Sequence, residues 1–341
     1  MSAILRTVFS AAVVLTASFV LGALCPVSAV SFPDPLALQG AHVYVHDPSL
    51  IQRQSDGKYF LFTSHNKSGI ITADQLQGPW TEVGSTLPNN SSIQLPGRSD
   101  IWAPDVSYHN GTYYQYYAVS TSGSHISGIG LATSASMDPG TWTDHGLVIQ
   151  SNNNSLYNCI DPTLLVDTNG TRRLTFGSYW NDTYQVNLGA DYQTVISQPV
   201  HTSFNASGNH DQEGSFLWPH GGYYYFFVSS GQCCGFDPQN LPPPGTEYKV
   251  FVGRSPSPSG PFIDQAGVDM LHGGGTLVIA SHGSVYAPGG EGVFTDSKSG
   301  KDIFVYHYLP ADGPAPYTEP QASLGLNAID WSSGWPVLTS I

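Results

Sequence analysis

The sequence of 341 residues predicts an all-β fold, a five-bladed β-propeller. Five segments share one pattern: a carboxylate, a few apolar residues, a turn that usually contains Gly, and a run rich in Tyr, Phe, Val and Leu. They open at Asp47, Asp105, Asp161, Glu213 and Glu291, so the openings lie 58, 56, 52 and 78 residues apart, spacings typical of blades. No long amphipathic helix is indicated, whereas β-branched and aromatic runs bounded by Gly, Asn, Ser and Pro recur.

Each segment predicts the start of one blade. In chain order the segments read DPSLIQRQSDGKYFLFTS, DVSYHNGTYYQYYAVS, DPTLLVDTNGTRRLTFGSY, EGSFLWPHGGYYYFFVSS and EGVFTDSKSGKDIFVYHY. If these are equivalent strands of stacked blades, the same end of each faces the axis. Acids from distant parts of the chain would then meet in one central pocket, which indicates an enzyme.

A second recurring pattern predicts the outer strands of three blades. Segments 71–84, 131–146 and 252–267 share a small polar turn, then Gly, an aromatic residue and a closing Gly, and are expected in blades one, two and four. The fourth spacing is longer because Gly231–Tyr248 is inserted, and we expect a surface loop near the pocket mouth. The last blade ends around Trp331–Leu338. We therefore expect one propeller domain over residues 30–341.

Residues 1–29 are predicted to be a secretion signal. Arg6 supplies a positive start, residues 8–24 are apolar, and Val27-Ser28-Ala29 is a small-residue cleavage site. No other segment approaches the length of a membrane span. We expect a secreted, extracellular protein without a membrane partner. Eight Asn-x-Ser/Thr sequons make it a candidate glycoprotein: Asn66, Asn89, Asn90, Asn110, Asn153, Asn169, Asn181 and Asn205.

Charge and composition favour a neutral ligand. The formal net charge is −14 at pH 7, which disfavours nucleic acid, anionic membranes and acidic polysaccharides. The aromatic content of 12% suits sugars, whose C–H faces lie on aromatic rings. Outside the signal only Cys159, Cys233 and Cys234 remain. The adjacent pair is either a vicinal disulfide or two separate thiols.

Three acids at matching positions are the candidate catalytic residues: Asp47, Asp161 and Glu213. A carboxylate in a propeller strand is costly unless it is paired or functional, and the repeat makes these three converge. Hydrolysis of a glycosidic bond needs one carboxylic acid to protonate the leaving oxygen and a second carboxylate to activate water or attack the sugar. A third negative charge nearby would raise the pKa of the acid.

Several motifs carry a resemblance to glycoside hydrolases of family 43 over nearly the whole mature chain. The matching stretches are VHDPSLI (45–51), SDIWAPDVSYHNGTYY (99–114), YNCIDPTLLVD (157–167), FGSYW (176–180), GSFLWPHGGYYYFFVS (214–229) and VYHYLP (305–310). Within the family the chain is most similar to secreted fungal-type enzymes that cleave plant cell-wall arabinan internally. The resemblance implies a five-bladed propeller, arabinan endo-1,5-α-L-arabinosidase activity and inversion at the anomeric carbon.

The resemblance also implies roles. Asp47 would be the general base, Glu213 the general acid, and Asp161 the residue that raises the pKa of the acid and orients it. For inversion, base and acid should lie about 6.5–9.5 Å apart. Asp105 matches no catalytic position and is expected to be structural or a minor pocket residue.

Further positions match binding residues of the family. Trp102 would stack on an arabinose ring or pack in the core, and Asn158 and Ser178 would bond sugar hydroxyls or neighbouring acids. His307 matches a histidine beside a calcium or other ion on the axis; its alternative is a satisfied core histidine. No organic cofactor is expected.

The chain departs from the family pattern in three places. Gly214-Ser215 follows the expected acid where Ala-Pro or Gly-Pro is frequent. Glu291 stands in Ala287–Glu291 where a neutral residue is usual, and Cys159 stands where Ala is common.

Alternatives remain open at this point. An exo-acting α-L-arabinofuranosidase or β-xylosidase would differ in loops that block one end of the cleft. A retaining invertase-type propeller is disfavoured, because its Asn-Asp-Pro-Asn and Glu-Cys signatures are absent. A non-catalytic sugar-binding propeller should lack one of the three acids. We expect a monomer, since a propeller closes its own edges.

Overall fold

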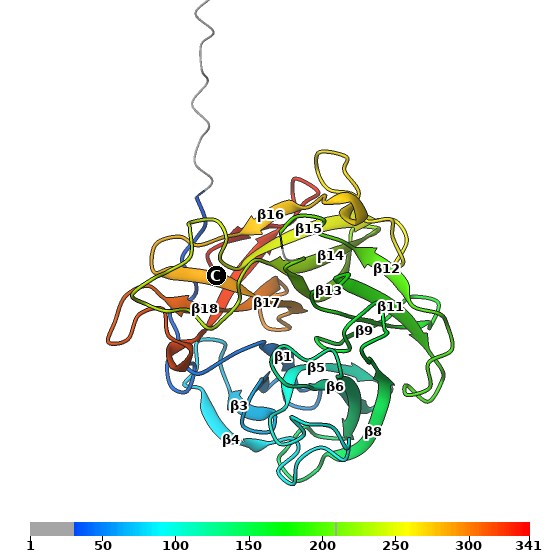
Figure 1. Ribbon diagram of the computed structural model, residues 1–341. Coiled ribbons are helices and arrows are strands. Elements are labelled where there is room, and N and C mark those ends of the chain that lie inside the picture. Colours follow the sequence, from blue (N-terminus) through cyan, green and yellow to red (C-terminus); the bar gives the residue numbers. More distant parts are fainter. Residues whose placement is uncertain (1–30, 209) are drawn as a thin grey trace, which may run out of the picture. The chain divides into compact units, whose positions relative to one another are not determined.

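The computed structural model describes residues 31–208 and 210–341, so the predicted signal peptide at 1–29 lies outside the described residues. Five antiparallel sheets of four strands each make up the unit Phe32–Ile341. In every sheet the strands pair in chain order. Figure 1 shows the sheets arranged around an axis, with the first strand of each nearest the centre. The predicted all-β fold, a five-bladed propeller, is confirmed.

The strand bounds follow the five blades. Blade one holds β1 (Ser49–Gln52), β2 (Tyr59–Thr63), β3 (Gly69–Ala73) and β4 (Thr81–Ser85); blade two holds β5 (Trp102–His109), β6 (Thr112–Val119), β7 (Gly128–Ser134) and β8 (Thr143–Gln150). Blade three holds β9 (Thr163–Val166), β10 (Arg172–Phe176), β11 (Thr183–Leu188) and β12 (Val200–Ser203). Blade four holds β13 (Gln212–His220), β14 (Tyr223–Ser230), β15 (Lys249–Ser255) and β16 (Thr276–Ile279); blade five holds β17 (Val285–Thr295), β18 (Asp302–Pro310), β19 (Ser323–Asp330) and β20 (Val337–Thr339). Two short 3₁₀ helices complete the described elements, η1 (Met270–His272) and η2 (Glu319–Gln321).

Local sequence explains the hairpins and the buried strands. Asn110 and Gly111 both have positive φ, 49° and 84°, so they form the two-residue turn that twists correctly between β5 and β6. The central strand β2, with sequence YFLFT, is buried along its whole length. β-Branched and aromatic residues suit a strand that is covered on both faces by neighbouring blades.

The blades pack face to face through apolar clusters shared by neighbours. One cluster joins Tyr59 and Leu61 of blade one to Phe294 and Leu326 of blade five. Others join blades one and two, two and three, three and four, and four and five. No blade therefore buries its faces alone.

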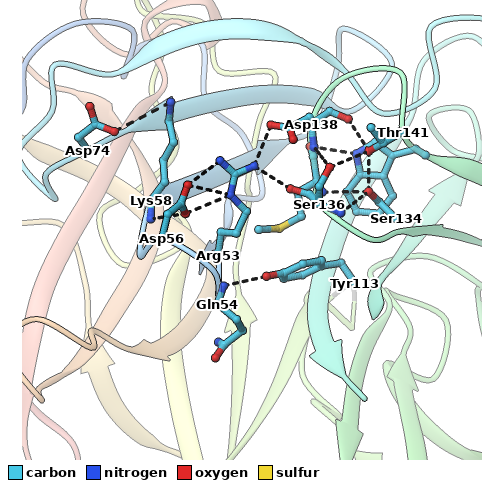
Figure 2. A network of polar contacts seen from close by, with 12 residues as sticks. Arg53, Gln54, Asp56, Lys58, Asp74, Tyr113, Ser134, Ser136, Asp138 and Thr141 are labelled. Atoms are coloured by element: carbon cyan, nitrogen blue, oxygen red, sulfur yellow. Dashed lines mark hydrogen bonds and ion pairs between the residues drawn. The ribbon is translucent and has the colours of Figure 1, made fainter. Parts of the chain in front are cut away.

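Polar contacts add to the packing between blades one and two. The guanidinium of Arg53, just after β1, donates to Asp138 Oδ1 at 2.8 Å and to the Ser136 carbonyl at 3.0 Å, while its other nitrogens bind Asp56 (Figure 2). These contacts join the β1–β2 hairpin to the loop between β7 and β8.

The segment that precedes β1 closes the ring. Leu36 N donates to Leu326 O of β19, whereas Ala41 N donates to Trp80 O next to β4. The same chain segment thus binds the last blade and the first.

The expected outer strands are found, with one difference. Segments 71–84 and 131–146 cover parts of the last two strands of blades one and two. Segment 252–267 holds only part of β15, and the outermost strand of blade four, β16, begins at Thr276. The chain first forms η1, where Asp269 caps the helix with its side chain. Cys233 and Cys234 are joined by a disulfide, and Cys159 is a buried thiol. Among the described residues, none of the helices is long and apolar enough to cross a membrane.

Candidate active site

A cavity of about 620 Å³ runs along the axis and is lined by the first strands of all five blades. Asp47, Asp161 and Glu291 contribute to its lining, and Gly214 does so beside Glu213. The acids that open the repeats thus converge, as the repeat predicts. Asp105 also lines the cavity, but its carboxylate accepts Leu164 N at 2.9 Å and fixes β5 against β9.

Backbone irregularities turn the acids inward. Asp47 and Asp161 each precede a proline, stand two residues before their strands and have positive φ, 45° and 54°. Glu213 lies inside β13, where the pairing with β14 shifts register between Glu213 and Phe216. Strained residues and bulges of this kind re-aim side chains at functional sites.

Asp47 is held as an anion. Ser64 Oγ donates to its Oδ2 at 2.6 Å, and His46 Nδ1 lies 3.7 Å from its Oδ1. Burial alone would raise the pKa of Asp47, but the nearby positive charge of His46 and the hydrogen bond from Ser64 hold it below its ordinary value. A carboxylate that is ionised and 30% exposed can accept a proton from water.

His46 lies between two carboxylates. Its Nε2 is 2.8 Å from Glu319 Oε2 at η2, and its other ring nitrogen faces Asp47. Burial lowers the pKa of His46, yet the two carboxylates outweigh burial and raise it to about 10. His46 therefore carries a positive charge beside Asp47.

Glu213 is the counterpart of Asp47, and both of its carboxyl oxygens accept hydrogen bonds. Ser178 Oγ donates to its Oε2 at 2.5 Å, and the Tyr248 hydroxyl donates to its Oε1 at 3.0 Å. Burial raises the pKa of Glu213 above its ordinary value, although these two hydrogen bonds oppose the rise. Glu213 thus suits the donation of a proton.

Asp161 is coupled to this acid. Its Oδ2 accepts Gly214 N at 3.2 Å, directly beside Glu213 in the chain. Burial, and then the charges of Glu213 and Asp47, raise the pKa of Asp161 well above its ordinary value. Because two neighbouring carboxyls resist double ionisation, the pair retains a proton more readily than either acid would alone.

The predicted binding residues take different places. Ser178 contacts Glu213 directly, as described above. Trp102 begins β5 with a partly exposed ring whose Nε1 lies 3.3 Å from Asp100 Oδ2. Asn158 is buried and accepts Ser151 Oγ at 3.3 Å. Neither Trp102 nor Asn158 hydrogen-bonds the three acids in the described part of the chain.

Sequence reasoning missed His46, Ser64 and Tyr248. His46 is adjacent to Asp47, so the motif itself carried a signal. Ser64 ends its repeat segment 17 residues after Asp47, as Ser178 stands 17 residues after Asp161, so the repeat also carried a signal for Ser64. Tyr248 gave none, because it reaches the site from the inserted segment. Glu291, which opens the fifth repeat and departs from the family pattern, accepts a hydrogen bond from Ser229 Oγ. Burial raises the pKa of Glu291 to about 8.

His307 lies at the centre of β18 and is 1% exposed. Its Nδ1 accepts the N–H of Asp47 at 3.1 Å, and its Nε2 is buried without a hydrogen-bond partner among the described residues. Ligand atoms of His46, Asp47 and His307 lie within 4.8 Å of one another.

Of the three residues in this cluster, only His307 offers an atom suited to binding a cation. A protonated His46 cannot ligate a metal. An unpartnered, buried Nε2 is the kind of atom that a cation satisfies, but ligation there requires the hydrogen on Nδ1 and so competes with the contact from Asp47 N–H.

The chain is similar to known carbohydrate-active proteins over most of its length. The model of "Glycosyl hydrolases family 43" matches residues 41–336. A "Probable arabinan endo-1,5-alpha-L-arabinosidase A" of Aspergillus clavatus is 49% identical over 308 residues, 90% of this chain and 94% of that protein. The native arabinanase structure of Bacillus subtilis aligns with a TM-score of 0.75 and 30% identity, covering 87% of this chain and 98% of that one. An exo-1,5-α-L-arabinanase structure from a bovine ruminal metagenomic library aligns with a TM-score of 0.76 and 31% identity, covering 91% and 100%.

Proposed function

The chain belongs to glycosyl hydrolase family 43, and on that premise we propose that it hydrolyses internal α-1,5-L-arabinofuranosidic linkages of arabinan with inversion. One observation carries the proposal. The site brings together a carboxyl group whose pKa is lowered, Asp47, and two whose pKa is raised, Glu213 and Asp161. Environments that push carboxyl pKa values apart assign a base and an acid. The curated relative from Aspergillus clavatus is named for this cleavage.

In the proposed reaction, Asp47 accepts a proton from water as the water oxygen attacks the anomeric carbon. Glu213 gives its proton to the leaving glycosidic oxygen, and the electron pair of the broken O–H bond stays on Glu213. Asp161 keeps Glu213 protonated and orients it through Gly214. His46 holds Asp47 ionised, which a proton acceptor needs.

We propose that an ion such as calcium binds on the axis through His307 Nε2, with water filling its other positions. When bound it would add positive charge beside Asp47 and favour the ionised base. His46 is not a ligand in this proposal, because its ring is committed to Asp47 and Glu319.

The proposal also covers where the protein acts and in what form. Plant cell-wall arabinan lies outside cells, so the substrate fits the predicted signal and the sequons, and we propose a secreted, glycosylated monomer. Trp102 remains the proposed stacking residue, because its ring stays partly exposed.

The test is release of reducing ends from linear 1,5-arabinan, with product lengths followed by chromatography. We expect Glu213→Gln and Asp47→Asn to lower kcat by about 10²–10⁴-fold with native thermal stability. Early release of mixed oligomers supports endo action, whereas steady release of one short product indicates the exo action of the metagenomic relative. Binding without turnover would support a sugar-binding propeller, and xylan-derived products a β-xylosidase.

A further inference from the structure

Tyr248 brings a hydroxyl from the inserted segment to the acid of the active site. It is 2% exposed and directly precedes β15. The base of Gly231–Tyr248 is closed by two backbone bonds, from Gln232 N to Thr246 O and from Tyr248 N to Gln232 O, both at 2.9 Å. The position of Tyr248 is therefore fixed by the strand-like base of the insertion.

The ring of Tyr248 occupies space that a side chain would fill. A Cβ added to Gly289 would lie 2.1 Å from Tyr248 Cδ1, so the ring packs on bare backbone of β17. The ring also lies near His307, with ring centroids 6.0 Å apart and planes at 28°. Packed on this backbone, the ring places its hydroxyl 3.0 Å from Glu213 Oε1.

Glu213 is the hydrogen-bond partner of the Tyr248 hydroxyl. A buried hydroxyl that failed to donate would lose free energy, so its hydrogen must point at Oε1. Burial and the surrounding carboxylates raise the pKa of Tyr248 well above its ordinary value, so it stays a donor.

We propose that Tyr248 is a positioning residue of the hydrolytic reaction, which orients Glu213 and stabilises the carboxylate formed when Glu213 gives up its proton. The inference rests on the proposed function of Glu213 as the acid. As the Glu213 O–H bond breaks and the proton passes to the leaving oxygen, the electron pair left on the carboxyl is met by hydrogen bonds from Tyr248 and Ser178. Hydrogen bonds to a charged group are stronger than those to a neutral one, so they favour this step. The insertion thus contributes to the chemistry, beyond shaping the surface.

Other charged or titratable groups face the acid, and Tyr248→Phe leaves them in place. Blades one, three and five contribute Asp47, His46, Asp161, Glu291, Tyr179 and Asp182. A change in the titration of Glu213 after Tyr248→Phe therefore reports the lost hydroxyl.

The experiment compares Tyr248→Phe with Tyr225→Phe. Tyr225 is buried in the same blade, and its hydroxyl donates to Gly334 O at 2.7 Å and accepts from Arg254 Nη1 at 3.5 Å, so this control also loses the hydrogen bonds of a buried hydroxyl. On linear arabinan we expect Tyr248→Phe to lower kcat about 10- to 100-fold, with KM within about two-fold. The alkaline limb of kcat/KM should move to higher pH, because the hydrogen bond that lowered the pKa of Glu213 is gone. Tyr225→Phe should change neither.

An unmoved alkaline limb in a folded Tyr248→Phe, or equal losses in both variants, would overturn the inference. A substrate-free measurement separates it from the proposed function. The ¹³C shift of the Glu213 carboxyl, assigned with Glu213→Gln, should titrate at higher pH in Tyr248→Phe than in the wild type. An upward shift supports the role of Tyr248 even if arabinan proves not to be the substrate, and no shift refutes it.

Discussion

Replacing Gly290 with Ala should damage the base without unfolding the protein. Gly290 has φ of 60°, and an added Cβ would lie 2.7 Å from His307 Nδ1 and 2.8 Å from Asp47 Oδ1. Ordinary contact begins at 3.4 Å, so both contacts are too short by more than half an ångström. His307 is buried inside β18, so the backbone at Gly290 must shift away from it and Asp47 must give way as well. Because a misplacement of about 1 Å can cost about 10²-fold, we expect kcat to fall about 10- to 100-fold.

Gly221→Ala is the matched control. Gly221 has φ of 57°, and nothing lies within 4 Å of an added Cβ. Both substitutions carry the left-handed backbone cost of about 1–2 kcal/mol, but only Gly290→Ala places a methyl group against residues of the site. Reducing-end assays and thermal unfolding of the two variants should show similar losses of Tm and a loss of kcat in Gly290→Ala alone. Equal kcat in the two variants would refute the reasoning.

Three further predictions concern charge. Asp161→Asn should move the alkaline limb of kcat/KM to lower pH, because the coupled carboxyl that keeps Glu213 protonated is lost; an unchanged pH profile would contradict this. Glu291→Gln should raise Tm increasingly between pH 4.5 and about 8 and leave it unchanged below, because the raised pKa means that the folded wild type loses stability as Glu291 ionises. A uniform gain would point to packing instead. A chelator should lower the Tm of the wild type but not that of His307→Gln, since a ligand bound only by the folded state stabilises it; equal responses would argue against a cation at His307.

The repeat was sufficient to predict the blades because each copy of it is one continuous stretch of sequence. Each opening motif precedes or enters a first strand, and Gly-containing turns separate the apolar runs. The outermost strand of blade four was missed, since the recurring pattern at 252–267 resembles the outer strands of blades one and two while the chain continues through η1 to Thr276. The path of the chain between β15 and β16 depends on the space left by the packed blade, which the local sequence pattern does not specify.

The convergence of the acids on the axis could be predicted because Asp47 and Asp161 occupy equal positions, two residues before their strands. Their environments could not be predicted in the same way. Tyr248 lies outside the opening motifs, and Ser64, the last residue of the first one, was not singled out. Sequence reasoning therefore found the carboxyl groups and one of their hydroxyl partners, Ser178, and missed Ser64 and Tyr248.

The opposite pKa shifts of Asp47 and Asp161 arise from tertiary contacts. Asp47 and Asp161 have the same residue type, the same following proline and the same backbone region, yet the pKa of one is lowered and that of the other raised. The difference lies in their neighbours: Asp47 has the cation of His46, which is itself held by Glu319, 273 residues away, whereas Asp161 has Glu213. A repeat places equivalent carboxyls at the axis, and contacts with residues outside each acid's own repeat segment decide which of them keeps a proton.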